Sequence, residues 1–199
     1  MAIPPKSTSE KIAAVALKML ERDGADSVTM RAVAAAARVT PMAIYHHFPN
    51  RDALLQHVAE QQFQNLVVCL SDRERGVSAR TDHRTVLAEL MQGYIDYALE
   101  HPRVFDFVFS RERPDARKFP DDFHARHSPT LNILADAVEA AVQARVLRKG
   151  DVWEIALELW ALVHGYIALY RAGRFKLSPK QFRELCARAI DRLFDGLVP

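Results

Sequence analysis

Apolar residues recur at helical spacing along most of the chain, and no segment shows a convincing strand pattern. The first apolar stripe comprises Ile12, Ala13, Ala16, Leu17 and Leu20. This stripe predicts a helix over residues 9–23, with Ser9 as its N-terminal cap and Gly24 as its C-terminal cap.

Two short helices are predicted next, each opened by a threonine that can cap it. Thr29 precedes a helix over residues 30–36, and Thr40 precedes a helix that runs to about His47. Because only about three residues connect them, the two helices should cross steeply. The apolar side chains expected to fill the angle are Val33, Val39 and Ile44. The pattern therefore predicts a helix-turn-helix over residues 29–48.

The rest of the chain predicts a bundle of mostly longer helices. Their expected ranges are 51–73, 82–100, a short helix after Pro102, 129–146, 152–172 and 179–194. Residues 111–123 are charged and contain two prolines, which predicts an irregular connector. We therefore expect an all-α fold with about nine helices: a three-helix head in residues 1–55 and a helical-bundle body in residues 56–199.

The composition agrees with a helical globular protein. About half of the 199 residues are apolar, and only 7 are glycine. The two cysteines, Cys69 and Cys186, lie far apart in apolar runs, which indicates buried, reduced thiols. Residues 1–9 are polar and contain no apolar stretch of signal-peptide length, and no apolar run appears long enough to span a membrane. We therefore expect a soluble, cytoplasmic protein without a membrane partner.

The small positive net charge is unevenly distributed. The chain carries +2, and its first 55 residues hold 7 basic and 5 acidic side chains. The remaining residues hold 20 of each, so the whole excess lies in the predicted head. An excess of two charges is within chance, but its position is the one expected for a head that faces a polyanion.

The outer face of the helix after Thr40 carries hydroxyl, thioether, aromatic and imidazole groups and no acid. Such a face, together with a free helix N-terminus, suits the major groove of double-stranded DNA and its flanking phosphates. The predicted DNA-binding residues are Thr29, Arg31, Thr40, Pro41, Met42, Ala43, Tyr45, His46, His47 and Arg51.

The roles expected near the helix N-termini follow from side-chain chemistry. Thr29 and Thr40 can offer a hydroxyl and nearby backbone N–H groups to phosphate oxygens. Arg31 can reach a guanine edge or a phosphate, and Met42 and Ala43 can contact a thymine methyl group. The alternative for Arg31 is that it only forms a salt bridge within the protein.

The later part of the segment offers phosphate donors. Tyr45 and His47 can donate to phosphate, and Arg51 can anchor the DNA backbone from the first turn of the next helix. As alternatives, Tyr45 packs against the first helix and His46 is merely solvated. The segment as a whole is more specific than any of its members.

The segment from Thr29 to Leu55 resembles the helix-turn-helix of the TetR (tetracycline-repressor-like) family of regulators, and it reads TMRAVAAAARVTPMAIYHHFPNRDALL. The matching positions are Thr29, Val39, Thr40, Ile44, Tyr45, His47, Phe48, Arg51, Asp52, Leu54 and Leu55. Arg38 departs from the pattern, because these proteins usually place glycine before the valine. Arg51 replaces a common lysine. The resemblance covers about residues 8–57.

A second resemblance lies near the C-terminus. Trp160, His164 and Gly165 fill the Trp-x-x-x-His-Gly motif of one C-terminal subgroup of that family. His101-Pro102, followed by Phe105 through Phe109, also resembles that subgroup. The resemblance implies an all-helical body for ligand binding and dimerisation. The candidate ligand-binding residues, which suit a small apolar or aromatic effector, are Phe63, Tyr94, Tyr97, Phe105, Phe109, Trp160 and His164. The alternative is that these side chains are ordinary core residues, with a hydrogen-bonded histidine among them.

The last two predicted helices carry long apolar stripes. One side of each can face the body and another side a second subunit, which predicts a homodimer with a four-helix interface. A monomer in which both helices are internal is the alternative.

These features together predict a sequence-specific transcriptional regulator, a repressor rather than an activator. As a homodimer it would bind a near-palindromic DNA operator, and a small-molecule effector of unknown identity would release it. The effector would bias the fourth helix, which joins body to head, by binding one state better than the other. No other cofactor is expected.

No catalytic or metal site is predicted. The chain has no Gly-rich phosphate loop, no Gly-x-Ser-x-Gly elbow and no His-Glu-x-x-His motif. His124 and His127 are spaced like a metal pair, but they lie in a charged connector without a third candidate ligand. Two rival interpretations remain: a helical enzyme or carrier with a vestigial head, and a protein-interaction module that uses the helix-turn-helix for docking.

Overall fold

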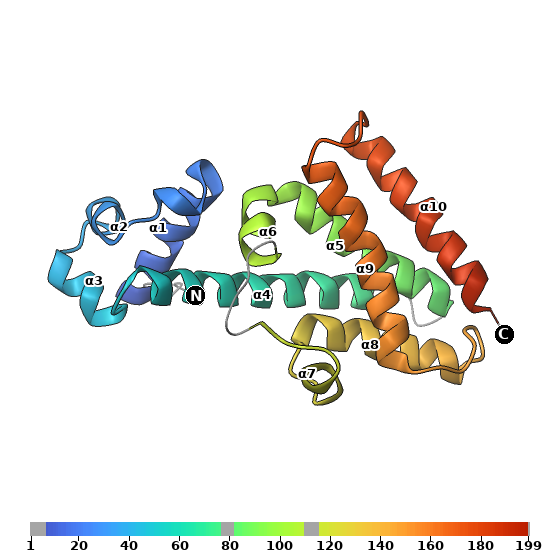
Figure 1. The fold of residues 1–199 in the computed structure, drawn as a ribbon. Coiled ribbons are helices and arrows are strands. Elements are labelled where there is room, and N and C mark those ends of the chain that lie inside the picture. Colours follow the sequence, from blue (N-terminus) through green and yellow to red (C-terminus); the bar gives the residue numbers. More distant parts are fainter. Residues whose placement is uncertain (1–6, 77–81, 110–115, 199) are drawn as a thin grey trace. The chain divides into compact units, whose positions relative to one another are not determined.

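The computed structural model describes residues 7–76, 82–109 and 116–198, and every regular element in these ranges is helical (Figure 1). The elements are α1 Thr8–Asp23, a 3-10 turn Ala25–Ser27, α2 Met30–Ala37, α3 Pro41–His47, α4 Arg51–Gly76, α5 His83–Glu100, α6 Pro102–Phe109, α7 Asp121–His124, α8 Pro129–Gln143, α9 Val152–Arg171 and α10 Pro179–Leu197. The predicted all-α class is confirmed. The described residues form ten α-helices, nine of them with at least seven residues.

The cap of the first helix is Ser7, two residues earlier than the predicted cap. The Ser7 hydroxyl accepts a hydrogen bond from the Glu10 N–H (3.2 Å), and the Glu10 carboxylate accepts one from the Ser7 N–H (2.8 Å). The prediction of Ser9 as the cap is wrong, because Ser7 has a glutamate three residues later and Ser9 does not. The reciprocal pair satisfies two backbone donors that one serine could not.

The predicted irregular connector contains a short helix. Residues 110–115 lie outside the described part of the chain, but α7 spans Asp121–His124. Its first turn carries Asp121 and Asp122, whose charges suit a helix N-terminus, and the Asp122 carboxylate accepts a hydrogen bond from the Lys118 N–H (2.7 Å). Pro120 directly precedes this helix and does not prevent it.

By its internal contacts the chain divides into two units, and the boundary between them falls within α4. The head unit comprises residues 1–64 and 101–111, and the body unit comprises residues 65–100 and 112–199. The head unit therefore includes α6, although α6 follows α5 in the chain. These units are defined by contacts and not by function, so the predicted boundary between a DNA-binding and a ligand-binding domain after residue 55 stays a prediction.

The head unit is built around α1, which packs against α2, α3 and α6. Ile12 and Leu20 of α1 are fully buried, as is Val33 of α2. Ala34 and Ala37 are also buried, and their small side chains let α2 approach α1 closely. This core fixes the two short helices against a longer one.

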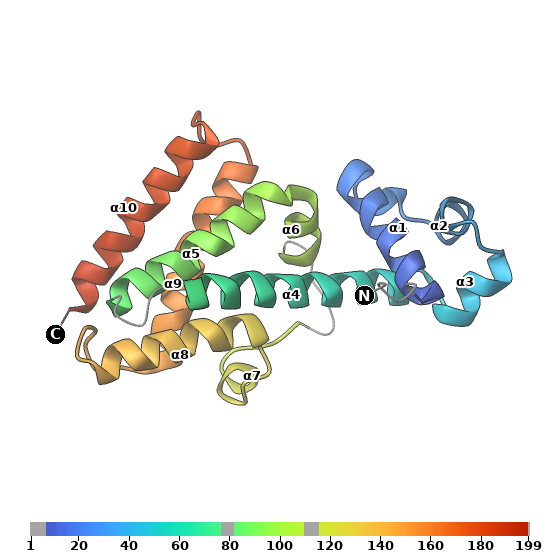
Figure 2. The ribbon, with the colours of Figure 1, turned by 180° about the vertical axis from the view of Figure 1, so that it is seen from behind.

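The body unit is a bundle in which α5 packs against α8, α9 and α10 (Figures 1 and 2). In addition, α9 packs against α8 and α10. Its largest fully buried side chains are Leu66, Leu87, Leu90, Ile95, Leu147, Phe182 and Phe194. Leu66, from the second half of α4, belongs to this set, so that half of α4 is packed into the body.

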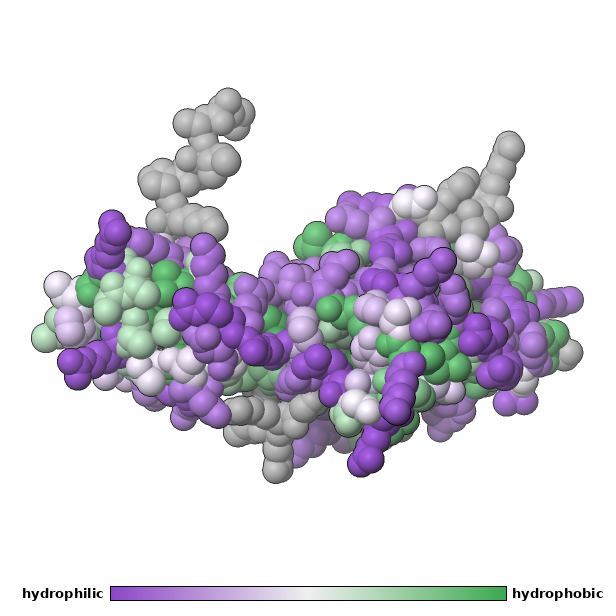
Figure 3. Space-filling view, turned by 90° about the horizontal axis from the view of Figure 1, so that it is seen from above, coloured by the Kyte–Doolittle hydropathy of each residue, from purple (hydrophilic) through white to green (hydrophobic). Residues whose placement is uncertain are grey.

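Helix α9 is apolar along most of its length, and many of its side chains are only half-buried. Its length and composition would allow it to cross a membrane, with a mean hydropathy of 1.4, yet only 28% of that window is buried. This corrects the expectation that no apolar run reaches such a length. Leu169 is 48% exposed, and apolar side chains reach the molecular surface among hydrophilic ones (Figure 3).

Candidate nucleic-acid interface

Both helices of the helix-turn-helix begin at the predicted threonine caps. The Thr29 hydroxyl accepts a hydrogen bond from the Ala32 N–H (3.2 Å), and the Thr40 hydroxyl accepts one from the Ala43 N–H (3.2 Å). Pro41 occupies the first position of α3, where a missing N–H leaves no bond unmade. The local sequence thus determines where each short helix starts.

The turn between α2 and α3 depends on a left-handed residue. Arg38 has φ 55° and ψ 47°, and its N–H bonds to the Ala35 carbonyl oxygen (3.1 Å). The following Val39 N–H bonds to the Ala34 carbonyl oxygen (3.0 Å), which closes α2 after eight residues. Glycine adopts this conformation at lower cost, so the departure from the family pattern carries strain.

Apolar side chains fill the angle between the two helices as predicted. Val33 is fully buried, Ile44 is 1% exposed and Val39 is half-buried. With Ile44 turned inward, the opposite side of α3 faces away from the core. The sequence pattern therefore identified the inner face of α3 correctly.

The outer face of α3 is open to solvent. Met42 is 80% exposed and Tyr45 is 53% exposed, whereas Ala43 is half-buried. His46 and His47 are exposed, with their rings edge to face at 5.3 Å. The exposure of Tyr45 argues against the alternative in which it packs against α1.

Arg31, in the first turn of α2, is also exposed. No other residue in the described ranges forms a hydrogen bond or ion pair with its guanidinium. The alternative of a purely internal salt bridge therefore has no support in the described residues. An unpaired guanidinium is available for a phosphate or a guanine edge.

Arg51 differs from the other predicted contacts, because the head already uses its side chain. Nε donates to the Val28 carbonyl oxygen (2.7 Å) and Nη2 donates to the Ala25 carbonyl oxygen (2.7 Å). Asp26 and Asp52 lie 3.9 Å from its guanidinium nitrogens. Arg51 thus ties the start of α4 to the turn after α1, a role that sequence reasoning missed. Its contact with DNA stays a prediction.

Arg38 is a further cation at this interface that the sequence reasoning did not propose as a DNA contact. Its side chain is exposed in the turn that leads into α3, and within the described residues no hydrogen bond or ion pair holds it. The signal that could have identified it is the departure itself, an arginine where glycine is usual.

The predicted ligand-binding residues divide between the two units. In the head unit, the ring centroid of Phe109 lies 5.5 Å from that of Phe63 and 4.7 Å from that of Phe105. Tyr94 and Tyr97 are buried in the body unit. Membership of one common pocket therefore stays a prediction.

Three of these residues form a hydrogen-bonded group in the body unit. The Trp160 Nε1–H donates to the Tyr94 hydroxyl (3.0 Å), and that hydroxyl lies 3.0 Å from the Nδ1 of His164. Because the hydroxyl accepts from the indole, its own proton can be donated to Nδ1, which gives a neutral His164 protonated at Nε2. Burial raises the pKa of Tyr94 and lowers that of His164. This geometry supports the alternative of a hydrogen-bonded core histidine.

The remaining histidines and the cysteines have separate surroundings. His124 Nε2 lies 3.8 Å from the Asp151 carboxylate, whereas His127 Nδ1 lies 3.3 Å from the Asp122 carboxylate. Cys186 is buried, and burial raises its thiol pKa to about 11. Cys69 is only half-buried, which is less than the sequence predicted.

Two family models match the chain. The model described as "Bacterial regulatory proteins, tetR family" matches residues 12–58, and the model described as "Tetracyclin repressor-like, C-terminal domain" matches residues 87–193. An uncharacterized HTH-type transcriptional regulator of Mycobacterium tuberculosis is 27% identical over 173 residues. That alignment covers 87% of this chain and 74% of the relative.

Solved structures share the fold over nearly the whole chain. A protein of unknown function from a Rhodococcus species has a TM-score of 0.83 at 27% identity, with 99% of this chain and 100% of that chain covered. The TetR-family transcriptional regulator PfmR from Thermus thermophilus has a TM-score of 0.65 at 18% identity, with 94% and 99% covered. At the latter identity the likeness concerns the fold alone.

Proposed function

The chain belongs to the TetR family of bacterial transcriptional regulators, and from that premise we propose that it is a repressor that a small-molecule effector releases from its operator. One observation carries the proposal: the helix-turn-helix holds an acid-free face of α3 in solvent, together with an exposed, unpaired arginine on α2. The side chains on this face are not needed for the packing of the core, and their chemistry is suited to DNA.

The proposed contacts follow the chemistry of the exposed groups. Arg31 reads a guanine edge or binds a phosphate, and Tyr45 and His47 donate to phosphates. Met42 lies against a thymine methyl group. The N-termini of α2 and α3, capped by Thr29 and Thr40, add backbone donors.

The exposed apolar surface of α9 supports a homodimer through α9 and α10. Only 28% of the apolar window in α9 is buried within one chain, and Leu169 is 48% exposed, so a second copy packed there would cover apolar surface. A two-fold axis then presents two heads to half-sites about 34–36 Å apart, one turn of B-DNA.

The effector is proposed to bind within the body unit. Tyr94, Trp160 and His164 provide aromatic surface with a fixed hydrogen-bond order, which suits a small apolar or aromatic molecule. Because α4 contributes to both units, an effector that prefers one position of its second half shifts the DNA-binding population.

The central experiment is selection of a binding site from random double-stranded DNA, followed by fluorescence anisotropy. We expect a near-palindromic site, and Arg31→Ala and Tyr45→Ala should each weaken binding by about 5- to 150-fold. Arg22→Ala is the matched control, because Arg22 is an exposed arginine of α1 that pairs with Asp23. Full affinity in both head variants, or wild-type indifference to all DNA at low salt, would refute the docking.

Dimerisation has its own test. Leu169→Glu places a charge on the exposed side of α9 and should shift sedimentation toward the monomer. Val68→Glu is the control, because Val68 is a similarly exposed residue on α4 (57%) outside the proposed interface. A wild-type protein that sediments as a monomer at micromolar concentration contradicts the dimer.

Repression and release are tested with a reporter placed behind the selected operator. Expression of the protein should lower reporter output, and a compound that restores output should also weaken DNA binding by the purified protein. Activation of the reporter would reverse the proposed sign of regulation.

A further inference from the structure

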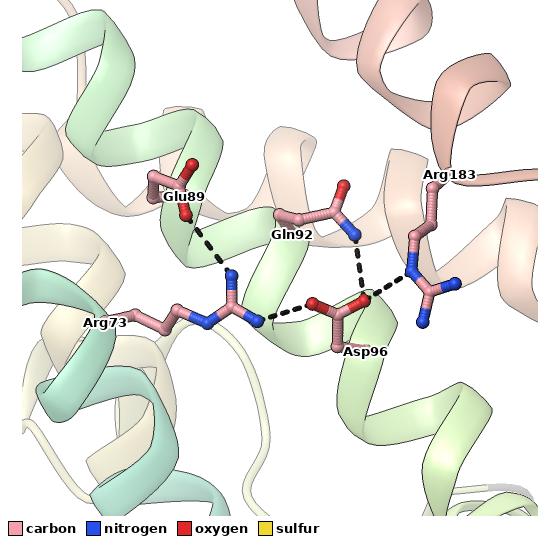
Figure 4. Close-up of polar contacts among 5 residues, drawn as sticks. All are labelled: Arg73, Glu89, Gln92, Asp96 and Arg183. Atoms are coloured by element: carbon pink, nitrogen blue, oxygen red, sulfur yellow. Dashed lines mark hydrogen bonds and ion pairs between the residues drawn. The ribbon is translucent and has the colours of Figure 1, made fainter. Parts of the chain in front are cut away.

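The Asp96 carboxylate on α5 lies at the centre of a polar network that joins three helices of the body unit (Figure 4). One oxygen, Oδ2, lies 2.5 Å from Arg73 Nη2 on α4. The other, Oδ1, accepts from Arg183 Nε on α10 (2.6 Å) and from Gln92 Nε2 (3.0 Å). Arg73 Nη1 also donates to Glu89 (3.2 Å), so α4 is held by two carboxylates of α5.

The network is well shielded and remains charged. Only 15% of the Asp96 side chain is exposed, compared with 35% for Arg73 and 36% for Arg183. Burial by itself would raise the pKa of Asp96, but hydrogen bonds from Arg183, Gln92 and Arg73 outweigh it and lower that pKa. The carboxylate is therefore ionised at neutral pH, and both of its oxygens are engaged.

The backbone is adapted to the same spot. A Cβ on Gly93 of α5 would lie 3.2 Å from Arg73 Cγ and 3.3 Å from Leu70 Cδ2, which is tighter than ordinary contact. The missing side chain leaves room for the Arg73 and Leu70 side chains of α4 beside α5. Shape and charge thus agree on one relative position of these helices.

The helices joined at Asp96 have different partners in the proposed function. α4 begins in the head unit and ends in the body unit, whereas α10 belongs to the proposed dimer interface. A second link, from Arg84 to Asp195 (2.6 Å), joins α5 to α10 without α4. The ion pairs of Asp96 differ from this second link because one of them, with Arg73, includes α4.

We propose that Asp96 is a positioning residue for operator binding: its carboxylate fixes the second half of α4 against α5 and α10, and so determines which half-site spacing the dimer accepts. The inference rests on the proposed function, because it requires a dimer that binds two half-sites. If α4 is held rigidly, binding to an operator with the wrong half-site spacing costs free energy. If α4 is loosened, each head can move to fit the altered spacing.

The test measures affinity for three operators with full-length protein. They are the selected operator and versions whose spacer is longer or shorter by one base pair. Asp96→Asn keeps the size of the side chain but removes the charge, and it should lose about fivefold or more of the discrimination between the correct and altered spacers. Its affinity for an isolated half-site should equal that of the wild type.

Two control variants remove carboxylates of similar type. Asp195→Asn removes the charge that pairs with Arg84 between α5 and α10, where Arg84 also donates to the Asp191 carbonyl oxygen (3.0 Å). Asp72→Asn removes the charge that pairs with Arg75 within α4, where both side chains are exposed. Both should retain the spacing discrimination of the wild type. Equal loss in these controls would overturn the special role of Asp96.

The two arms of the network are separated by Arg73→Gln and Arg183→Gln. Each should reduce discrimination on its own, and each should add little to Asp96→Asn, because all three act through the same carboxylate. If Asp96→Asn fails to fold by circular dichroism, Arg73→Gln tests the α4 arm while Asp96 keeps its partner on α10.

Each result decides between the two proposals. Unchanged discrimination in Asp96→Asn or Arg73→Gln overturns the positioning role, as does an equal loss of affinity for every spacer and for the half-site. A wild-type protein that selects no operator contradicts the proposed function instead, and this is known before any variant is measured.

Discussion

Two polar side chains of the head, Arg31 and Tyr45, contrast with two of the body, Tyr94 and Asp96. In the head, Arg31 and Tyr45 are exposed, and no hydrogen bond from another described residue holds either of them. In the body, Tyr94 is buried with hydrogen bonds to two side chains, and Asp96 joins two arginines from different helices. Groups of similar chemistry are thus left open in one unit and satisfied in the other.

The contrast separates side chains available for binding a partner from side chains that hold the fold together. An exposed donor contributes little to folding stability, so its removal should be felt only when a partner binds. A satisfied buried group leaves its partners unpaired when it is removed, so its loss should lower stability. Variants in the two units should therefore affect different measurements, and the predictions below run from the largest expected effect to the smallest.

The two faces of α3 offer the sharpest comparison. Ile44→Ala removes a side chain that is 1% exposed and should lower the free energy of unfolding by about 2–5 kcal/mol. Met42→Ala changes a side chain that is 80% exposed and should alter it by less than about 0.5 kcal/mol, while weakening operator binding. Urea denaturation measures both, and a large loss in Met42→Ala would contradict the outward orientation of Met42.

Two tyrosines extend the comparison across the units. Tyr94→Phe leaves the Trp160 Nε1–H and the His164 Nδ1 without their shared partner and should cost about 1–3 kcal/mol of stability. Tyr45→Phe loses a hydroxyl on an exposed ring and should cost less than about 0.5 kcal/mol. Denaturant midpoints test this, and similar losses in both variants would remove the distinction between the units.

The pH dependence of stability should report on His164. Burial lowers its folded-state pKa below the ordinary value of 6.5, so the unfolded chain takes up a proton that the folded chain resists. Stability should therefore fall as pH decreases below about 6.5 and through the lowered pKa. Melting temperatures between pH 7.5 and about 5 measure this, and His164→Gln should flatten the profile relative to the wild type. An unchanged slope in that variant would assign the dependence to other groups.

The smallest expected effect is a gain. Arg38→Gly in the head and Arg145→Gly in the body each replace a residue held at positive φ (55° and 59°) and should stabilise the protein by about 0.5–1 kcal/mol. Arg126 has a similar φ of 61°, but it also forms an ion pair with Asp136, so Arg126→Gly should gain less. Thermal melting compares the three, and a loss of stability in Arg38→Gly would reveal an uncharted role for its side chain in the fold.

Much of the head could be predicted from residues close together in sequence. Thr29 and Thr40 cap their helices as expected, because a cap involves only the next three residues. Ile44 is buried and Tyr45 exposed because helical periodicity separates the faces of α3. The misplaced cap at Ser9 was also a local matter, since the spacing of Ser7 and Glu10 is visible in the sequence.

Other features depend on contacts between distant residues. The role of Arg51 at the carbonyl oxygens of Ala25 and Val28 has no periodic signal, and neither has the placement of α6 with the head. The predicted aromatic set was chosen by residue type, so it could not reveal that its members divide between two units. Asp96 was not singled out at all, because a lone aspartate on a helix is usually solvated.

The sequence alone determined most of the helices, the threonine caps of the helix-turn-helix and the family, because these follow from residue types a few positions apart. Only the tertiary structure decided which polar groups are open and which are bound. Asp96 meets Arg73 and Arg183 because three helices pack together, and Tyr94 meets Trp160 and His164 in the same way. Such encounters depend on the packing of helices far apart in the chain, which helical periodicity does not encode.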